Sequence, residues 1–191
     1  MTTKQSASSS SGKVGAGEKL DHVPLFTQEQ LRGRVLELGK QITQEHAGEQ
    51  IVVIGVLKGA FIFMADLVRA IDLPLTVEFI GVSSYAGTES TGHVRITHDL
   101  SAEIRDKTVI LVEDIIDSGR TIDYLLDVLR LRQPRTLKIA ALLSKPEAHV
   151  MHNKIDYVGF EISKEFVIGY GLDYNQQYRQ LPWLAQVKTQ T

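Results

Sequence analysis

The chain has 191 residues, of which 43% are hydrophobic, and this is enough to bury the core of one domain. A formal net charge of −2 and a sequence pI near 6.3 exclude a general electrostatic attraction to nucleic acids or anionic membranes. The absence of cysteine excludes disulfides and cysteine nucleophiles and is typical of a reducing compartment, so we expect a soluble, cytoplasmic protein. Its longest apolar run, Ile51–Leu57, is far shorter than the about 20 residues that cross a bilayer.

The N-terminal segment 1–22 is rich in Ser and Gly and lacks the apolar region of a secretory signal. We expect it to be a disordered tail, followed by a single domain over residues 23–191 that includes a small cap made from N- and C-terminal segments. The sequence TQEQ at 27–30 fits a capping box, with Thr27 at the N-cap. Apolar residues then recur at helical spacing: Leu31, Val35, Leu38 and Ile42. We therefore expect the ordered chain to begin near Thr27 with an amphipathic helix.

Strand and helix patterns then alternate, which favours an α/β fold with a mainly parallel sheet flanked by helices. Strands are expected at 51–57, 75–82, 93–97, 108–114 and 136–144, and helices at 58–72 and 120–132. The polar segment 83–92 has almost nothing to bury and is expected to be a mobile loop. After residue 145 the pattern loosens. We expect the segments 155–163, 165–174 and 181–184 to form a small cap, or hood, over the sheet edge.

Three acidic residues lie where the strand at 108–114 ends and the next helix begins: Glu113, Asp114 and Asp117. Ligands of parallel sheets bind outside the carboxyl ends of the strands. Backbone N–H groups at the start of a helix favour a phosphate, and here the Ser118 and Thr121 hydroxyls lie close to them. Neighbouring acids can bind sugar hydroxyls and Mg²⁺, and a third acid can act as a general base. The pattern predicts a phosphorylated ribose that undergoes chemistry.

These three acids, and four residues further along the chain, also have purely structural interpretations. Glu113 and Asp114 can simply end the strand. Asp117 can be the N-cap of the following helix. Lys145 can be a solvated lysine, and Phe166 a core residue. Asp173 and Arg179 can form a surface salt bridge.

A resemblance extends these observations. VILVEDIIDSGRT at 109–121 matches the 5-phosphoribosyl-1-diphosphate (PRPP) motif of the type I phosphoribosyltransferases. The segment 145–179 resembles the C-terminal half of the hypoxanthine (guanine) phosphoribosyltransferases, and VLKG at 56–59 and SSY at 83–85 occur in the expected order. The resemblance covers about residues 25–184 and implies the phosphoribosyltransferase fold with its hood.

The resemblance implies a role for each matching residue. Glu113 and Asp114 would bind the ribose hydroxyls directly or through Mg²⁺, and Asp117 would accept a proton at purine N7. The 5′-phosphate would lie in the turn made by Ser118, Gly119, Arg120 and Thr121. The pyrophosphate loop would consist of Leu57, Lys58 and Gly59, with a non-proline cis peptide at its first bond, and Arg179 would bind the departing pyrophosphate.

The purine site is implied in the same way. Lys145 would donate to the 6-oxo group, Phe166 would stack on the ring, and the Val167 backbone would contact the purine edge. Leu172 and Asp173 would complete this site, with Asp173 also helping to hold a second Mg²⁺. Ser84 and Tyr85 would close over the substrates as a lid, although Tyr85 can also be a plain loop aromatic.

The implied activity is purine salvage: transfer of the phosphoribosyl group from PRPP to hypoxanthine, and also guanine, giving IMP or GMP and pyrophosphate. The expected partners are these small molecules, and we expect a homo-oligomer, a dimer or a tetramer. Two alternatives stay open, a type I transferase for another base and a PRPP-binding regulator that binds RNA. The near-neutral charge disfavours the regulator, because RNA binding needs a basic face.

Overall fold

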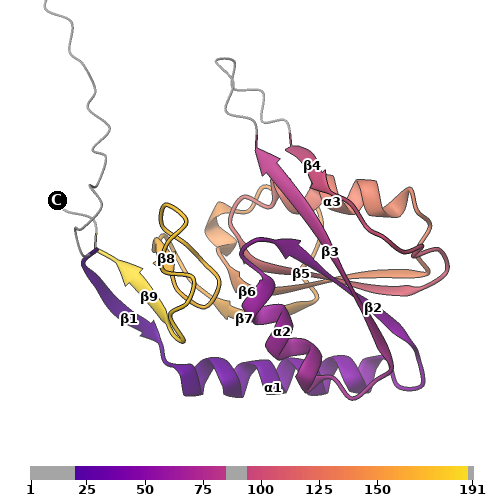
Figure 1. The fold of residues 1–191 in the computed structure, drawn as a ribbon, viewed down its shortest axis with the longest axis horizontal. Coiled ribbons are helices and arrows are strands. Elements are labelled where there is room, and N and C mark those ends of the chain that lie inside the picture. Colours follow the sequence, from indigo (N-terminus) through magenta and orange to yellow (C-terminus); the bar gives the residue numbers. More distant parts are fainter. Residues whose placement is uncertain (1–19, 85–93, 189–191) are drawn as a thin grey trace, which may run out of the picture.

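The computed structural model describes residues 20–84 and 94–188. The helices are α1 (Gln28–Glu45), α2 (Phe61–Ala70) and α3 (Arg120–Arg130), with a 3-10 turn η1 (Pro146–Ala148). The strands are β1 (His22–Phe26), β2 (Ile51–Leu57), β3 (Leu75–Ser84), β4 (Val94–His98), β5 (Thr108–Ile116), β6 (Thr136–Ser144), β7 (Tyr157–Glu161), β8 (Val167–Ile168) and β9 (Leu184–Val187). Figure 1 shows their arrangement.

The larger sheet has six strands in the order β4-β3-β2-β5-β6-β7. Its strands are parallel except for β4, which is antiparallel to β3. The predicted α/β fold is confirmed. Because β2, β5 and β6 are parallel neighbours, they all end at the same edge of the sheet, and the loops that follow them lie there together.

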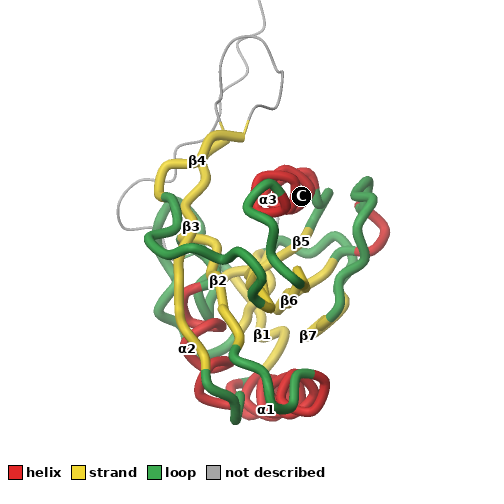
Figure 2. The backbone as a smooth tube through the Cα atoms, turned by 90° about the vertical axis from the view of Figure 1, so that its right-hand side faces the viewer, coloured by secondary structure: helices red, strands yellow, loops and turns green. Residues whose placement is uncertain are grey.

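The sheet is covered on both faces, as its continuous apolar strands predict. Along β2, Ile51 and Val53 face the core cluster that contains α1 and α2, whereas Val52, Ile54 and Val56 face the one that contains α3. Figure 2 shows α1 on one side of the sheet and α3 on the other. The capping box of α1 is also confirmed: the Gln30 backbone N–H donates to Thr27 Oγ1 at 3.3 Å, and the Thr27 backbone N–H donates to Gln30 Oε1 at 2.8 Å.

A second, three-stranded sheet with the order β1-β9-β8 forms the hood. In it β1 pairs antiparallel with β9, so the two ends of the described chain lie side by side (Figure 1). Two expectations are corrected here. Ordered structure begins with a strand at His22, before the predicted start at Thr27. The segment 155–163, expected in the hood, instead provides β7, the edge strand of the larger sheet.

Some expectations concern residues outside this description. Residues 1–19 of the expected tail, residues 85–92 of the expected loop and residue 93 of the strand expected at 93–97 lie outside the described residues, so the lid residue Tyr85 is not placed. Ser84 is the last residue of β3. Among the helices of 20–84 and 94–188, none combines the length and the apolar character needed to cross a membrane.

Candidate active site

The candidate site begins where β2 and β5 end. Glu113 and Asp114 lie on β5, and Leu57, the last residue of β2, precedes the Lys58–Gly59 turn. This turn runs so close to Asp114 that a Cβ atom on Gly59 would lie 1.7 Å from Asp114 Oδ2. The Leu57–Lys58 peptide bond is cis, as the resemblance implied. Only glycine permits this approach of the 57–59 loop to Glu113 and Asp114, which we call the acidic pair.

The surroundings of the acidic pair disfavour the charged form of both carboxyl groups. Burial, reinforced by the negative charge of Asp114, raises the pKa of Glu113 well above its usual value. Burial also raises the pKa of Asp114, while the positive charge of Arg179 acts in the opposite direction. Glu113 Oε2 is buried and has no hydrogen-bond partner among the described residues. Carboxylate oxygens with unused acceptor capacity suit a hard cation, so the pair fits Mg²⁺.

A tight turn follows β5 and leads into α3. Gly119 is the N-cap of α3 and has φ +81°, in the left-handed region that glycine tolerates. The interpretation of Asp117 as this N-cap is therefore wrong, and no side chain caps the helix. The first N–H groups of α3 are left for another acceptor, beside Ser118 and Thr121, which are half-buried, and Arg120, which is exposed.

Lys145 and Asp117 meet across this edge of the sheet. Lys145 directly follows β6, and its backbone N–H donates to the Ile116 carbonyl at 2.9 Å. Its ammonium group donates to Asp117 Oδ2 at 3.2 Å. The side chain of Lys145 is 14% exposed and that of Asp117 is 59% exposed. Lys145 is thus not a solvated loop lysine, and its charge is held beside the candidate base.

Two adjoining cavities open beside this pair. One, of about 220 Å³, is lined by Asp117 and Lys145, and the other, of about 350 Å³, by Phe166. Both share the lining residues Glu147, Ser163 and Lys164, which the sequence analysis missed because no motif marks them. Phe166 is 49% exposed, so it is not a core residue and its ring can receive a ligand. Val167, next to it, is buried in β8 and pairs with Gln186.

The chain after β8 brings a second group of polar residues to the acidic pair. Arg179 pairs with Asp173 through Nη2 and Oδ1 at 2.6 Å. Both side chains are mostly buried, at 18% and 26% exposure, so the pair is not a surface salt bridge. Leu172 is buried beside Asp173. Lys58 donates to Gln176 Oε1 at 3.2 Å, and this joins the 57–59 loop to the same segment. Gln176 was missed, because it lies in a stretch without periodicity.

Known proteins are similar to this chain over most of its length. The phosphoribosyl transferase domain model matches residues 25–175. A hypoxanthine phosphoribosyltransferase of Haemophilus influenzae is 46% identical over 174 residues, which cover 88% of this chain and 97% of that protein. The crystal structure of a hypoxanthine-guanine phosphoribosyltransferase from Bacillus anthracis is 46% identical with a TM-score of 0.85, covering 89% of this chain and 100% of that one.

Some relatives are much longer than this chain. The bifunctional protein TilS/HprT of Listeria monocytogenes is 44% identical over 165 residues, which are 86% of this chain but 26% of that protein. The chain thus spans about a quarter of the length of this relative and nearly the whole length of the Haemophilus protein. The chain belongs to the phosphoribosyl transferase domain family and, within it, to the hypoxanthine phosphoribosyltransferases.

Proposed function

We propose that the protein is a purine-salvage enzyme that transfers the 5-phosphoribosyl group from PRPP to hypoxanthine, and also to guanine. The products are IMP or GMP and pyrophosphate. The observation that carries this proposal is the meeting of four features at one edge of the sheet: the acidic pair, the uncapped start of α3, the 57–59 loop and the Lys145–Asp117 pair. Family membership supports the same activity.

The phosphoribosyl group would lie along the end of β5. The 5′-phosphate would accept hydrogen bonds from the turn formed by Ser118, Gly119, Arg120 and Thr121, because the N–H groups at the start of α3 lack a side-chain cap. Glu113 and Asp114 would accept hydrogen bonds from the ribose hydroxyls. In this pose the 5′-phosphate lies in the turn while the acids contact the ribose hydroxyls of the same ligand. The negative charges of the phosphate and the acids are thus kept apart.

The pyrophosphate would lie between the 57–59 loop and Arg179. Leu57, Lys58 and Gly59 would offer backbone groups and one ammonium, and Arg179 a guanidinium. Glu113 and Asp114 would hold one Mg²⁺, and Asp173 would help to hold a second. Among the described residues no three acidic or histidine side chains are grouped so that they could hold a single ion. Mg²⁺ would neutralise pyrophosphate charge when bound. The raised pKa values of Glu113 and Asp114 fit this, since a nearby cation would favour their charged forms.

The purine would occupy the two adjoining cavities. Lys145 would donate to the 6-oxo group, Phe166 would stack on the ring, and the backbone near Val167, Leu172 and Asp173 would contact the purine edge. The C1′–O bond to pyrophosphate breaks as the purine N9–C1′ bond forms, and the proton of the purine passes from N7 to Asp117. Ser84 and Tyr85 would complete the lid that excludes water, the competing nucleophile.

The direct test is an assay of PRPP consumption and nucleotide formation with four bases: hypoxanthine, guanine, xanthine and adenine. We expect product from hypoxanthine and guanine and essentially none from adenine. Removing divalent cations with a chelator should abolish turnover, and adding back Mg²⁺ should restore it. Failure to form IMP in the presence of Mg²⁺ would overturn the proposal, whereas turnover of adenine alone would move the protein to a transferase for another base.

The remaining expectations stay proposals of the same kind. The partners are the small-molecule substrates, and we propose a homo-oligomer, a dimer or a tetramer, which sedimentation analysis would test. The compartment proposed is the cytoplasm, supported by a sequence with no cysteine. The domain division also stays a proposal, with one domain over 23–191 after a tail; the tail expected over 1–22 must end earlier, because His22 already belongs to β1.

A further inference from the structure

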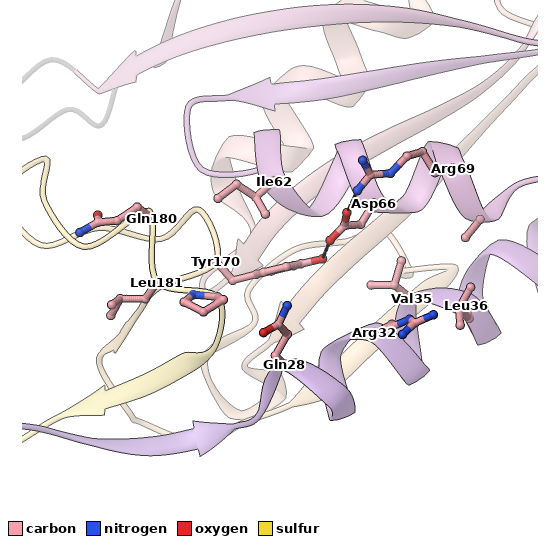
Figure 3. A pocket seen from close by; sticks show the side chains of 12 residues that line it. Gln28, Arg32, Val35, Leu36, Ile62, Asp66, Arg69, Tyr170, Gln180 and Leu181 are labelled. Atoms are coloured by element: carbon pink, nitrogen blue, oxygen red, sulfur yellow. Dashed lines mark hydrogen bonds and ion pairs between the residues drawn. The ribbon is translucent and has the colours of Figure 1, made fainter.

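A cavity of about 490 Å³ lies between the first half of α1, helix α2 and the segment around residues 170–182 (Figure 3). On its wall the Tyr170 hydroxyl donates to Asp66 Oδ2 at 2.5 Å. Tyr170 is only 6% exposed, whereas the Asp66 side chain, which also pairs with Arg69, is 35% exposed. Burial and this hydrogen bond raise the pKa of Tyr170, so the hydroxyl keeps its proton and acts as a donor.

The residue after Tyr170 contacts the proposed pyrophosphate loop. A Cβ atom on Gly171 would lie 2.1 Å from the Gly59 carbonyl oxygen, so the two backbones are in close contact. Gly171 is also joined to Arg179 twice: its N–H donates to the Arg179 carbonyl at 3.0 Å, and its carbonyl accepts from Arg179 Nη1 at 2.7 Å. Gly171 therefore connects Gly59 with Arg179, the two groups proposed to flank the pyrophosphate.

Tyr170 and Gly171 thus hold the C-terminal segment against the 57–59 loop and α2 at two points, in addition to the Lys58–Gln176 hydrogen bond. Gly59 precedes α2, and Asp66 lies within α2, so both contacts are made to the unit formed by the 57–59 loop and its helix. The contacts of Lys58 and Gly59 both lie at the loop end of this unit, so alone they would allow the segment to tilt about that end. The Tyr170–Asp66 hydrogen bond lies further along α2 and opposes this tilt, which would also fix the position of Arg179.

We propose that Tyr170 and Asp66 are positioning residues for the pyrophosphate end of PRPP: their hydrogen bond sets Arg179 and Gly59 at the spacing that this group requires. The inference rests on the proposed function. Neither side chain need touch substrate, since Tyr170 and Asp66 line the separate cavity shown in Figure 3. Small displacements of positioning groups are costly in rate and affinity.

The test removes the hydrogen bond without removing the ring. Tyr170→Phe should raise KM for PRPP by about three- to tenfold, the range expected for one hydrogen bond, with a smaller change in KM for hypoxanthine. Asp66→Ala should have a similar effect, and the double variant should be no worse than either single variant, because both delete the same bond. Asp66→Asn keeps an acceptor oxygen and should retain most of the affinity for PRPP.

Tyr157→Phe is the matched control. The Tyr157 hydroxyl is likewise mostly buried and donates to a carboxylate, Glu45 Oε2, at 2.6 Å, but it joins β7 to α1. We expect this variant to lose thermal stability while it keeps the PRPP KM of the parent. A purely structural role of Tyr170 would give the same result for Tyr170→Phe.

The outcomes separate the two proposals. A parent protein that forms no IMP overturns the proposed function and this inference with it. An active parent whose KM for PRPP is unchanged in Tyr170→Phe, or whose double variant shows additive losses, overturns the positioning role alone. If Tyr170→Phe fails to fold, the contrast between Asp66→Ala and Asp66→Asn decides: equal KM values for PRPP would contradict the inference.

Discussion

At the scale of single residues, Asp117 is the group on which the proposed chemistry depends. It is the more exposed partner of Lys145 and does not cap α3, so its carboxylate is available to a bound purine. Asp117→Asn should keep PRPP binding but lower kcat by about 10²–10⁴, the usual contribution of a positioned base. Steady-state kinetics and PRPP titration would measure this. A kcat within a few-fold of the parent would remove Asp117 from the mechanism.

Lys145 is the residue that should select the base. Its ammonium group has three hydrogens to donate and no acceptor. A 6-oxo group satisfies it, whereas the amino group of adenine places donors against donors, a mismatch that can discriminate by about 10⁴. Lys145→Met should lower kcat/KM for hypoxanthine by at least about tenfold. It should also lower the ratio of kcat/KM for hypoxanthine to kcat/KM for adenine. Unaltered hypoxanthine kinetics in this variant would contradict the assignment of Lys145.

The residues of the candidate site differ in how far the sequence could predict them. Glu113, Asp114 and Asp117 are contiguous with a strand and a turn, so the local pattern was enough to identify them. Lys145 and Arg179 could be assigned only through the resemblance, because their contacts depend on which strands are neighbours. Tyr170 and Gln176 had no signal at all, since their partners Asp66 and Lys58 lie more than 100 positions away.

At the scale of elements, the alternation of strands and helices was predicted correctly. The strand β1 and the sheet to which β7 belongs were not. β1 was missed because its sequence, HVPLF, contains a proline and is only partly buried, so it lacks an alternating pattern. The segment that forms β7 was assigned to the hood. A half-buried edge strand does show alternation, but the pattern says nothing about which of two sheets it joins.

The turn before α3 gives a prediction at this scale. Gly119→Ala adds a Cβ atom that would lie 2.5 Å from Met151 Cβ, at a φ of +81°. We expect KM for PRPP to rise by at least about tenfold, because the proposed 5′-phosphate site is displaced. Gly48→Ala is the matched control, since Gly48 also has φ +81° but nothing within 4 Å of the added atom. It should lower the melting temperature only. Parent-like PRPP affinity in Gly119→Ala would place the phosphate elsewhere.

At the scale of the whole molecule, side-chain hydrogen bonds join α1 to β7 at the edge of the sheet, and Arg34 makes two of them. Arg34 donates to the carbonyls of Val158 and Gly159 on β7, at 2.7 and 2.8 Å. Arg34→Met should lower the free energy of unfolding by about 1–2 kcal/mol. The loss of two fully buried hydrogen bonds would cost more, but the Arg34 side chain is 35% exposed. Urea unfolding would measure the loss. Lys40→Met, at an exposed position of the same helix, should change it by less than about 0.5 kcal/mol.

The pairing of β1 with β9 also sets an order of events during synthesis. β1 leaves the ribosome before the strands of the larger sheet, and its partner β9 leaves after them. The larger sheet can assemble while β1 waits unpaired, because all of its strands precede β8. Asp173 and Arg179 lie between β8 and β9, so they follow every strand of the larger sheet in the order of synthesis. A nascent chain that carries Glu113 and Asp114 but not yet β8 and β9 would therefore lack groups proposed to bind pyrophosphate, and catalysis would begin only after β9 has been made.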